Sequence, residues 1–114
     1  QHIACFTDNI YETVETMRRQ GVQFLDTPNA YYDVIDERVP NHGEDVERMR
    51  ANKILIDADA ETKKKLLLQI FTQNAVGPIF FEIIQRKGNT GFGEGNFQAL
   101  FESIEREQMR RGVL

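Results

Sequence analysis

The chain has 114 residues, with 18 acidic and 14 basic side chains and a formal net charge of −4. This acidic balance argues against nucleic acid as a partner, because phosphates require a basic surface. The longest apolar runs, residues 66–68 and 78–81, are too short to cross a bilayer, so no membrane association is expected. The single cysteine, Cys5, excludes an internal disulfide, fits a reducing, cytoplasmic location and is expected to be a packed, small hydrophobic side chain.

The first 25 residues are predicted to form a strand, a helix and a second, short strand. Residues 1–6 are mostly apolar and are typical of a strand. A helix is expected next, with Thr7 or Asp8 as its cap and apolar side chains on one face. Gly21 stands where a helix commonly ends, and residues 22–25 are expected to form the short strand.

The middle of the chain contains less regular patterns followed by a clear hairpin. We expect one short helix before Pro40 and another that ends near Ala51, separated by a polar loop. Two apolar segments, residues 53–58 and 66–72, flank a polar turn. Such a pair is typical of a β-hairpin.

The last third is predicted to hold a strand over residues 79–86, a glycine-rich loop over 88–95 and a closing helix over 96–111. The element order predicts an α+β fold, with residues 1–114 forming a single βαβββ unit and a carboxyl-terminal helix. One such unit leaves sheet edges and an apolar face uncovered. We therefore expect a second unit or a homo-oligomer to cover them.

Glu82 is the residue that most suggests chemistry. It lies in an apolar strand, and strand alternation places Phe80, Glu82 and Ile84 on one face. A carboxylate is costly to bury without a partner. Three interpretations stay open: this face is exposed to solvent, a cation such as Arg86 pairs with Glu82, or a metal ion binds it.

Other polar residues give weaker signals. His2 lies in an apolar strand and is either hydrogen-bonded structure or a ligand, and His42 lies in a polar loop. Gln69 interrupts an apolar strand and needs backbone, water or a ligand as its partner. The loop over residues 91–96 lacks the lysine that follows the glycines of phosphate loops, and Glu94 would repel phosphate.

Three segments together resemble the 4-hydroxyphenylpyruvate dioxygenases, most of all the bacterial members. These are Gln-His-Ile-Ala at 1–4, Leu-Leu-Gln-Ile-Phe-Thr at 67–72, and Phe-Glu-Ile-Ile-Gln-Arg at 81–86 with Gly-Phe-Gly-Glu-Gly-Asn-Phe at 91–97. The resemblance covers essentially the whole chain. It implies a vicinal-oxygen-chelate fold, in which this chain is the carboxyl-terminal portion of the catalytic domain of a longer dioxygenase and the closing helix is a lid.

The resemblance also implies roles for particular residues. His2 and Glu82 would be ligands of Fe(II), whose facial arrangement of two histidines and one carboxylate leaves positions for a 2-keto acid and O2. Substrate-binding side chains would be aromatic walls for a ring and amides that form hydrogen bonds. These are Gln69, Phe71, Phe92, Asn96, Phe97 and Gln1.

The implied reaction converts 4-hydroxyphenylpyruvate and O2 into homogentisate and CO2 in tyrosine catabolism. The upstream histidine ligand of the family has no counterpart in this chain. We expect the missing half of the barrel, or a second chain, to supply it, and we expect the chain alone to be inactive. Two alternatives stay open: hydroxymandelate synthase, which uses the same substrate and iron site, and a metal-free binding or assembly module with the same fold.

Overall fold

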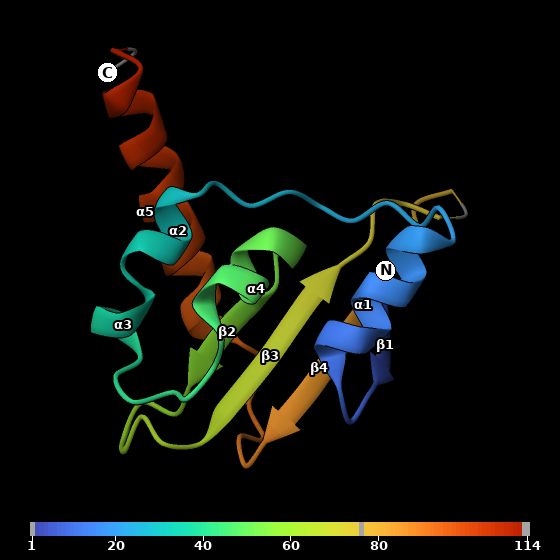
Figure 1. Ribbon diagram of the computed structural model, residues 1–114, viewed down its shortest axis with the longest axis horizontal. Coiled ribbons are helices and arrows are strands. Elements are labelled where there is room, and N and C mark those ends of the chain that lie inside the picture. The colour runs from blue at the N-terminus through green and yellow to red at the C-terminus, as the bar shows by residue number, and fades with distance from the viewer. Residues whose placement is uncertain (1, 76, 113–114) are drawn as a thin grey trace.

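The computed structural model describes residues 2–75 and 77–112, which contain one four-stranded sheet (Figure 1). Its strands are β1 (His2–Phe6), β2 (Leu55–Ala58), β3 (Leu66–Phe71) and β4 (Phe80–Lys87). They lie in the order β1-β4-β3-β2, with β1 parallel to β4 and the other pairs antiparallel. The predicted α+β fold with one βαβββ unit, including its hairpin, is confirmed.

Five helices occur in the described residues. They are α1 (Ile10–Arg19), α2 (Ala30–Asp33), α3 (Ile35–Arg38), α4 (Val46–Asn52) and α5 (Glu94–Arg110). Figure 1 shows α1 and α4 against the sheet, while α5 runs beside α2 and β2 and its end extends beyond them. Among the described residues, we find no helix that combines the length and the apolar character needed to span a membrane.

The first helix begins at Ile10, and its cap is Asn9 rather than the predicted Thr7 or Asp8. The Asn9 side chain accepts a hydrogen bond from the Glu12 backbone N–H at 3.2 Å. The Thr7 hydroxyl instead accepts a hydrogen bond from the Asn9 backbone N–H at 3.2 Å. The side chains of Thr, Asp and Asn are all able to cap a helix, so the local pattern did not distinguish among residues 7–9.

Two predicted elements have different extents in the structure. The helix predicted before Pro40 is divided into α2 and α3, because Val34 has non-helical backbone angles. The strand predicted over residues 22–25 is reduced to one isolated bridge, from Phe24 to Thr72. Phe24 thus pairs with Thr72, which directly follows the last residue of β3.

Cys5 is exposed, so its interpretation as a packed hydrophobic side chain was wrong. The reason is the position of β1 at the edge of the sheet, where it pairs only with β4 and all five of its residues are exposed. Ile3 and Phe6 on the same strand are 49% and 72% exposed. Apolar composition alone did not reveal that this strand is uncovered on both faces.

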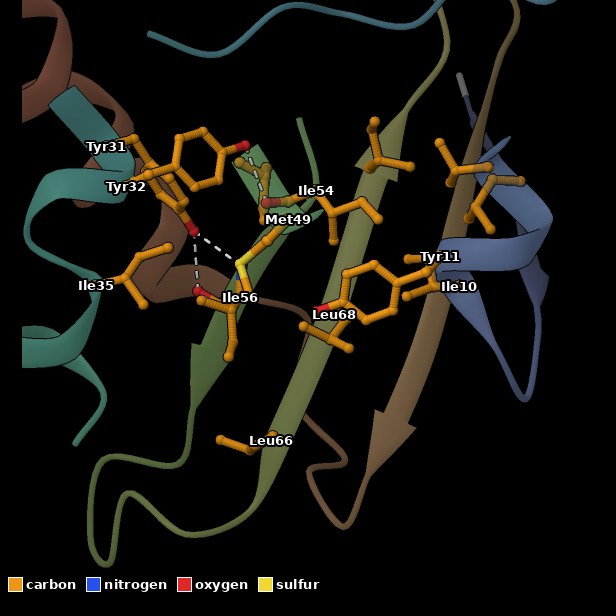
Figure 2. Close-up of a cluster of buried hydrophobic side chains, with 14 of the residues drawn as sticks. Ile10, Tyr11, Tyr31, Tyr32, Ile35, Met49, Ile54, Ile56, Leu66 and Leu68 are labelled. Atoms are coloured by element: carbon orange, nitrogen blue, oxygen red, sulfur yellow. Dashed lines mark hydrogen bonds between the residues drawn. The ribbon is translucent and has the colours of Figure 1, made fainter. Parts of the chain in front are cut away.

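The hydrophobic core lies between the sheet and helices α1 and α4. Leu68 is fully buried, and in Figure 2 Ile10 and Tyr11 of α1 point toward it across the sheet. Ile70 and Ile83 belong to the same cluster. Each large aliphatic side chain buried in this way contributes about 1.5–3 kcal/mol. The burial of these side chains on this face of the sheet therefore stabilises the fold.

The opposite face of the sheet carries the polar residues that the sequence singled out. The register pairs Glu82 of β4 with Phe71 on one side and with Ala4 on the other. Paired residues share a face, and residues two positions apart along a strand do too. Gln69 and His2 therefore lie on the same face as Glu82, away from α1.

Gln85 joins α1 to the sheet. Its Oε1 accepts a hydrogen bond from the Ile10 backbone N–H at 2.9 Å, and its Nε2 donates to the Asp8 carbonyl at 2.7 Å. We expect Gln85→Ala to lower the free energy of unfolding by about 1–3 kcal/mol, because both backbone groups lose their partner. Urea unfolding followed by circular dichroism measures this change. Gln85→Glu keeps the acceptor and should cost less, and a Gln85→Ala variant as stable as the parent would contradict the assignment.

Candidate functional site

The parallel pairing of β1 and β4 brings His2 and Glu82 together. His2 Nε2 lies 3.4 Å from Glu82 Oε1, and the His2 ring stacks on Phe80 with the ring centroids 5.6 Å apart. The His2 side chain is 52% exposed, whereas that of Glu82 is only 10% exposed. A buried carboxylate thus meets an accessible imidazole at the open edge of the sheet.

The electrostatics of Glu82 favour a cation beside it. Burial raises the pKa of the Glu82 carboxyl above its usual value, while the nearby His2 and Arg86 act in the opposite direction without cancelling this effect. The charged carboxylate is therefore incompletely compensated by its protein neighbours. A metal ion placed between the carboxylate and the imidazole would supply the missing positive charge.

The two types of side chain at the site suit Fe(II), but the set of ligands is incomplete. One imidazole nitrogen and one carboxylate oxygen are typical ligands of non-heme iron. Among residues 2–75 and 77–112, however, no group of three or more His, Cys, Asp or Glu side chains is arranged to hold a metal ion. His42 does not approach the pair, because its Nε2 lies 2.7 Å from Asp36 and its Nδ1 accepts from the Glu44 backbone N–H.

An aromatic cavity of about 420 Å³ adjoins the His2–Glu82 pair. It is lined by His2, Leu25, Phe71, Phe80, Glu82, Phe92 and Phe97. Phe71 and Phe80 lie on the sheet in a T-shaped (edge-to-face) arrangement, with their ring centroids 6.1 Å apart. Phe92 and Phe97, from the loop before α5 and from its first turn, are 76% and 70% exposed. Five of the eight predicted site residues therefore lie around one cavity.

Arg86 supports the loop that carries Phe92. Its Nη1 donates hydrogen bonds to the carbonyls of Asn89 (2.9 Å) and Gly91 (2.5 Å). Its guanidinium carbon also lies 5.9 Å and 6.0 Å from the ring centroids of Phe6 and Phe92. Arg86, which the sequence suggested as a possible partner of Glu82, therefore binds mainly to this loop.

Gln69 lies on the same sheet face but does not line the cavity. It is buried, and its Oε1 has no hydrogen-bond partner among the described residues. The backbone of Gly93 covers it so closely that a Cβ at that position would lie 2.1 Å from Oε1. Gln1, another predicted substrate contact, lies outside the described residues.

Asn96 is part of a buried polar network rather than a wall of the cavity. Its Oδ1 accepts from the Tyr31 hydroxyl at 2.5 Å and from Arg38 Nη2 at 3.3 Å. Arg38 also pairs with Asp57 at 3.5 Å. Sequence reasoning did not single out Tyr31, Arg38 or Asp57. Asp57 gave a signal that could have been used, because it interrupts the apolar strand β2 as Glu82 interrupts β4.

A larger cavity of about 700 Å³ lies between the end of α5 and residues 26–29, and its charges pair with one another, as in Lys53–Asp26 and Arg111–Glu107, both at 3.8 Å. The cavity beside His2 and Glu82 is smaller but combines an imidazole and a carboxylate, side chains able to bind a metal ion, with aromatic walls.

No protein-family model matches the chain. Over all 114 residues it is 63% identical to a 4-hydroxyphenylpyruvate dioxygenase of Legionella pneumophila and 60% identical to that of Pseudomonas aeruginosa. A Vibrio vulnificus protein named hemolysin VllY is 64% identical over the same length. The chain spans about a third of each of these proteins, 33%, 32% and 32%. This chain is a relative of the carboxyl-terminal third of 4-hydroxyphenylpyruvate dioxygenases.

Solved structures agree with this relationship. A mutant of 4-hydroxymandelate synthase from Streptomyces coelicolor matches 95% of the chain with a TM-score of 0.73 and 41% identity, over 30% of its own length. A fusion of a xylose isomerase-like TIM barrel with a 4-hydroxyphenylpyruvate dioxygenase matches 92% of the chain with a TM-score of 0.76 and 31% identity, over 17% of its length. The chain therefore shares the fold of the matched portions of these two structures.

Gly93 allows the loop to lie against Gln69. We expect Gly93→Ala to destabilise the protein by more than about 1 kcal/mol, because the new Cβ meets Gln69 and the residue has φ +77°. Gly43→Ala is the matched control, since Gly43 has φ +74° and open space around its Cβ position. Urea unfolding of both variants separates backbone strain from steric overlap. Equal losses for the two variants would contradict the close packing of Gly93 on Gln69.

Proposed function

We propose that this chain forms the carboxyl-terminal part of the active site of an Fe(II)-dependent dioxygenase. The reaction is the conversion of 4-hydroxyphenylpyruvate and O2 into homogentisate and CO2. The observation that carries the proposal is the meeting of His2 and Glu82 beside an aromatic cavity. The relationship to enzymes named 4-hydroxyphenylpyruvate dioxygenase supports it.

His2 and Glu82 would hold the iron through one imidazole nitrogen and one carboxylate oxygen. Bound Fe(II) supplies the activation of O2 and the binding of the 2-keto acid. A third protein ligand would come from the rest of a polypeptide about three times as long, or from a second chain, as the 33% coverage of the relatives suggests. Residues 1–114 would then be one portion of a catalytic domain of a cytoplasmic enzyme.

The side chains around the cavity would orient the substrate and exclude water. Phe71 and Phe80 on the sheet offer fixed aromatic faces, and Phe92 and Phe97 would close over the ring from α5 and the loop before it. A cavity of about 420 Å³ lies within the usual range for small-molecule sites. Excluding water protects a reactive oxidant from side reactions.

The amide side chains remain predicted substrate contacts. For Gln69, the support is a buried Oε1 without a partner in the described part of the chain, on the site face but beneath Gly93 and outside the lining of the cavity. A buried amide in this state gains from a hydrogen bond with a ligand. Asn96 is already engaged by Tyr31 and Arg38, so its contribution would be indirect.

Hydroxymandelate synthase is the second candidate function, and the structural match to such an enzyme at 41% identity favours it. The curated relatives named 4-hydroxyphenylpyruvate dioxygenase reach 63% identity, which favours homogentisate as the product. A metal-free assembly module is less consistent with the buried, incompletely compensated Glu82 beside His2.

Glu82 is the residue on which metal binding should depend. In the polypeptide that carries these residues, we expect Glu82→Ala to weaken anaerobic Co(II) binding by at least about 100-fold and to abolish turnover, because one of the few ligands is lost. Calorimetric titration measures the affinity. Glu61→Gln, in the exposed turn between β2 and β3, is the control and should leave the affinity unchanged. Equal affinity in the Glu82→Ala variant and the parent would refute the assignment of the ligand.

The product distinguishes the candidate functions. With Fe(II), ascorbate, O2 and 4-hydroxyphenylpyruvate, we expect the polypeptide to form homogentisate and CO2 in equal amounts, as measured by chromatography against authentic standards. Formation of 4-hydroxymandelate would establish the second candidate instead. A parent protein that binds neither Co(II) nor the substrate would support the metal-free module.

A further inference from the structure

We propose that Asp57 and Arg38 are positioning residues that hold the start of α5 over the aromatic cavity. The inference rests on the proposed function, because it concerns the closing of that same site. Asp57 lies on β2 and Arg38 on α3, and neither lines the cavity. Their effect on the substrate is therefore exerted through α5.

Asp57 caps α5 from a different element of the fold. The N-cap residue of α5 is Gly93, which has no side chain to accept hydrogen bonds from the first turn. Asp57 Oδ2 fills this role by accepting a hydrogen bond from the Gly95 backbone N–H at 2.9 Å. A carboxylate at this end of a helix also interacts favourably with the helix dipole.

The contact between Asp57 and Gly95 is so close that a side chain at position 95 would displace the Asp57 carboxylate. A Cβ at residue 95 would lie 2.5 Å from Asp57 Oδ1. The Asp57 residue is 8% exposed, so its carboxylate needs compensation. Gly95 and Arg38, whose Nη1 lies 3.5 Å from Oδ1, provide it.

Arg38 links this cap to the rest of the fold. Its Nη2 donates to the Ile56 carbonyl at 2.6 Å, to the Tyr31 hydroxyl at 2.8 Å and to Asn96 Oδ1 at 3.3 Å. The Tyr31 hydroxyl also donates to Asn96 and accepts from the Ile56 backbone N–H. Burial raises the pKa of Tyr31 to about 12, so the hydroxyl keeps its proton. α2, α3, β2 and the first turn of α5 are thus held by one buried network.

The network affects the cavity because it holds Gly95, which lies in the sequence between the two lining residues Phe92 and Phe97. Phe92 and Phe97 flank Gly95 and are 76% and 70% exposed, so their own packing holds them weakly. Releasing Gly95 lowers the population in which both rings cover the cavity. The apparent affinity for substrate falls in proportion to that population.

The test uses the whole polypeptide with Fe(II) and 4-hydroxyphenylpyruvate. Asp57→Ala raises KM about tenfold and leaves kcat within about twofold, the change expected from losing one charge-assisted hydrogen bond worth about 1.4 kcal/mol. Hydrogen exchange measured by mass spectrometry becomes faster at residues 93–97 and stays unchanged at Leu68 and Ile70 in the core. Asp57→Asn keeps an acceptor for Gly95 and restores most of the parent KM.

Asp33→Ala is the matched control, because Asp33 also pairs with an arginine, Arg50 at 3.2 Å, but its side chain is 56% exposed and, among the described residues, no hydrogen bond or ion pair joins it to α5. Its KM and hydrogen exchange match those of the parent. An Asp57→Ala variant with parental KM and parental exchange at residues 93–97 overturns the inference. Faster exchange throughout the chain with an unchanged KM overturns it as well, since that result describes a purely structural residue. A parent that turns over no 4-hydroxyphenylpyruvate refutes the proposed function instead, and exchange at residues 93–97 still tests the cap.

Discussion

The parallel pairing of β1 with β4 determines which side chains can meet at the site. β1 lies at the edge of the sheet and is held by β4 alone, yet it carries His2. Because side chains alternate along a strand, a shift of one residue in the register would turn His2 to the other face. The observed register, with Ala4 opposite Glu82, leaves His2 and Glu82 3.4 Å apart. The exposed edge strand β1 thus carries one of the two metal ligands proposed in this chain.

Two carboxylates interrupt apolar strands of this sheet, and the difference between them explains their roles. Asp57 on β2 has its partners within the chain, the Gly95 N–H and the Arg38 guanidinium. Among the described residues, the ion-pair contact of the Glu82 carboxylate is the 3.4 Å contact with His2, and burial keeps the pKa of Glu82 raised. A compensated buried charge organises the fold around it, whereas an incompletely compensated one favours binding of a cation.

Strand alternation predicted the sheet face of Glu82, and local patterns did not predict long-range partners. Strand alternation placed Glu82 and Gln69 correctly relative to their neighbours, since it depends only on a period of two residues. The exposure of Cys5 depends on strand order, which no local pattern contains. The contacts of Arg38 join residues 18 and 58 positions apart and arise only when α3, β2 and α5 pack together. Resemblance to a family supplied roles for His2 and Glu82 that spacing alone left open.

Residues of the sheet line one side of the cavity, and residues of α5 and the loop before it line the other. Phe71 and Phe80 are fixed by strands that share the hydrophobic core on their other face. Phe92 and Phe97 depend on a helix start that has no side-chain cap of its own and extends from a glycine with φ +77°. Such a division would let the proposed metal ligands stay in place while the aromatic cover moves, because different contacts hold the two sides of the cavity. The network at Asp57 joins β2 to the start of α5, so in its proposed role it would affect closing of the site without disturbing the His2–Glu82 pair.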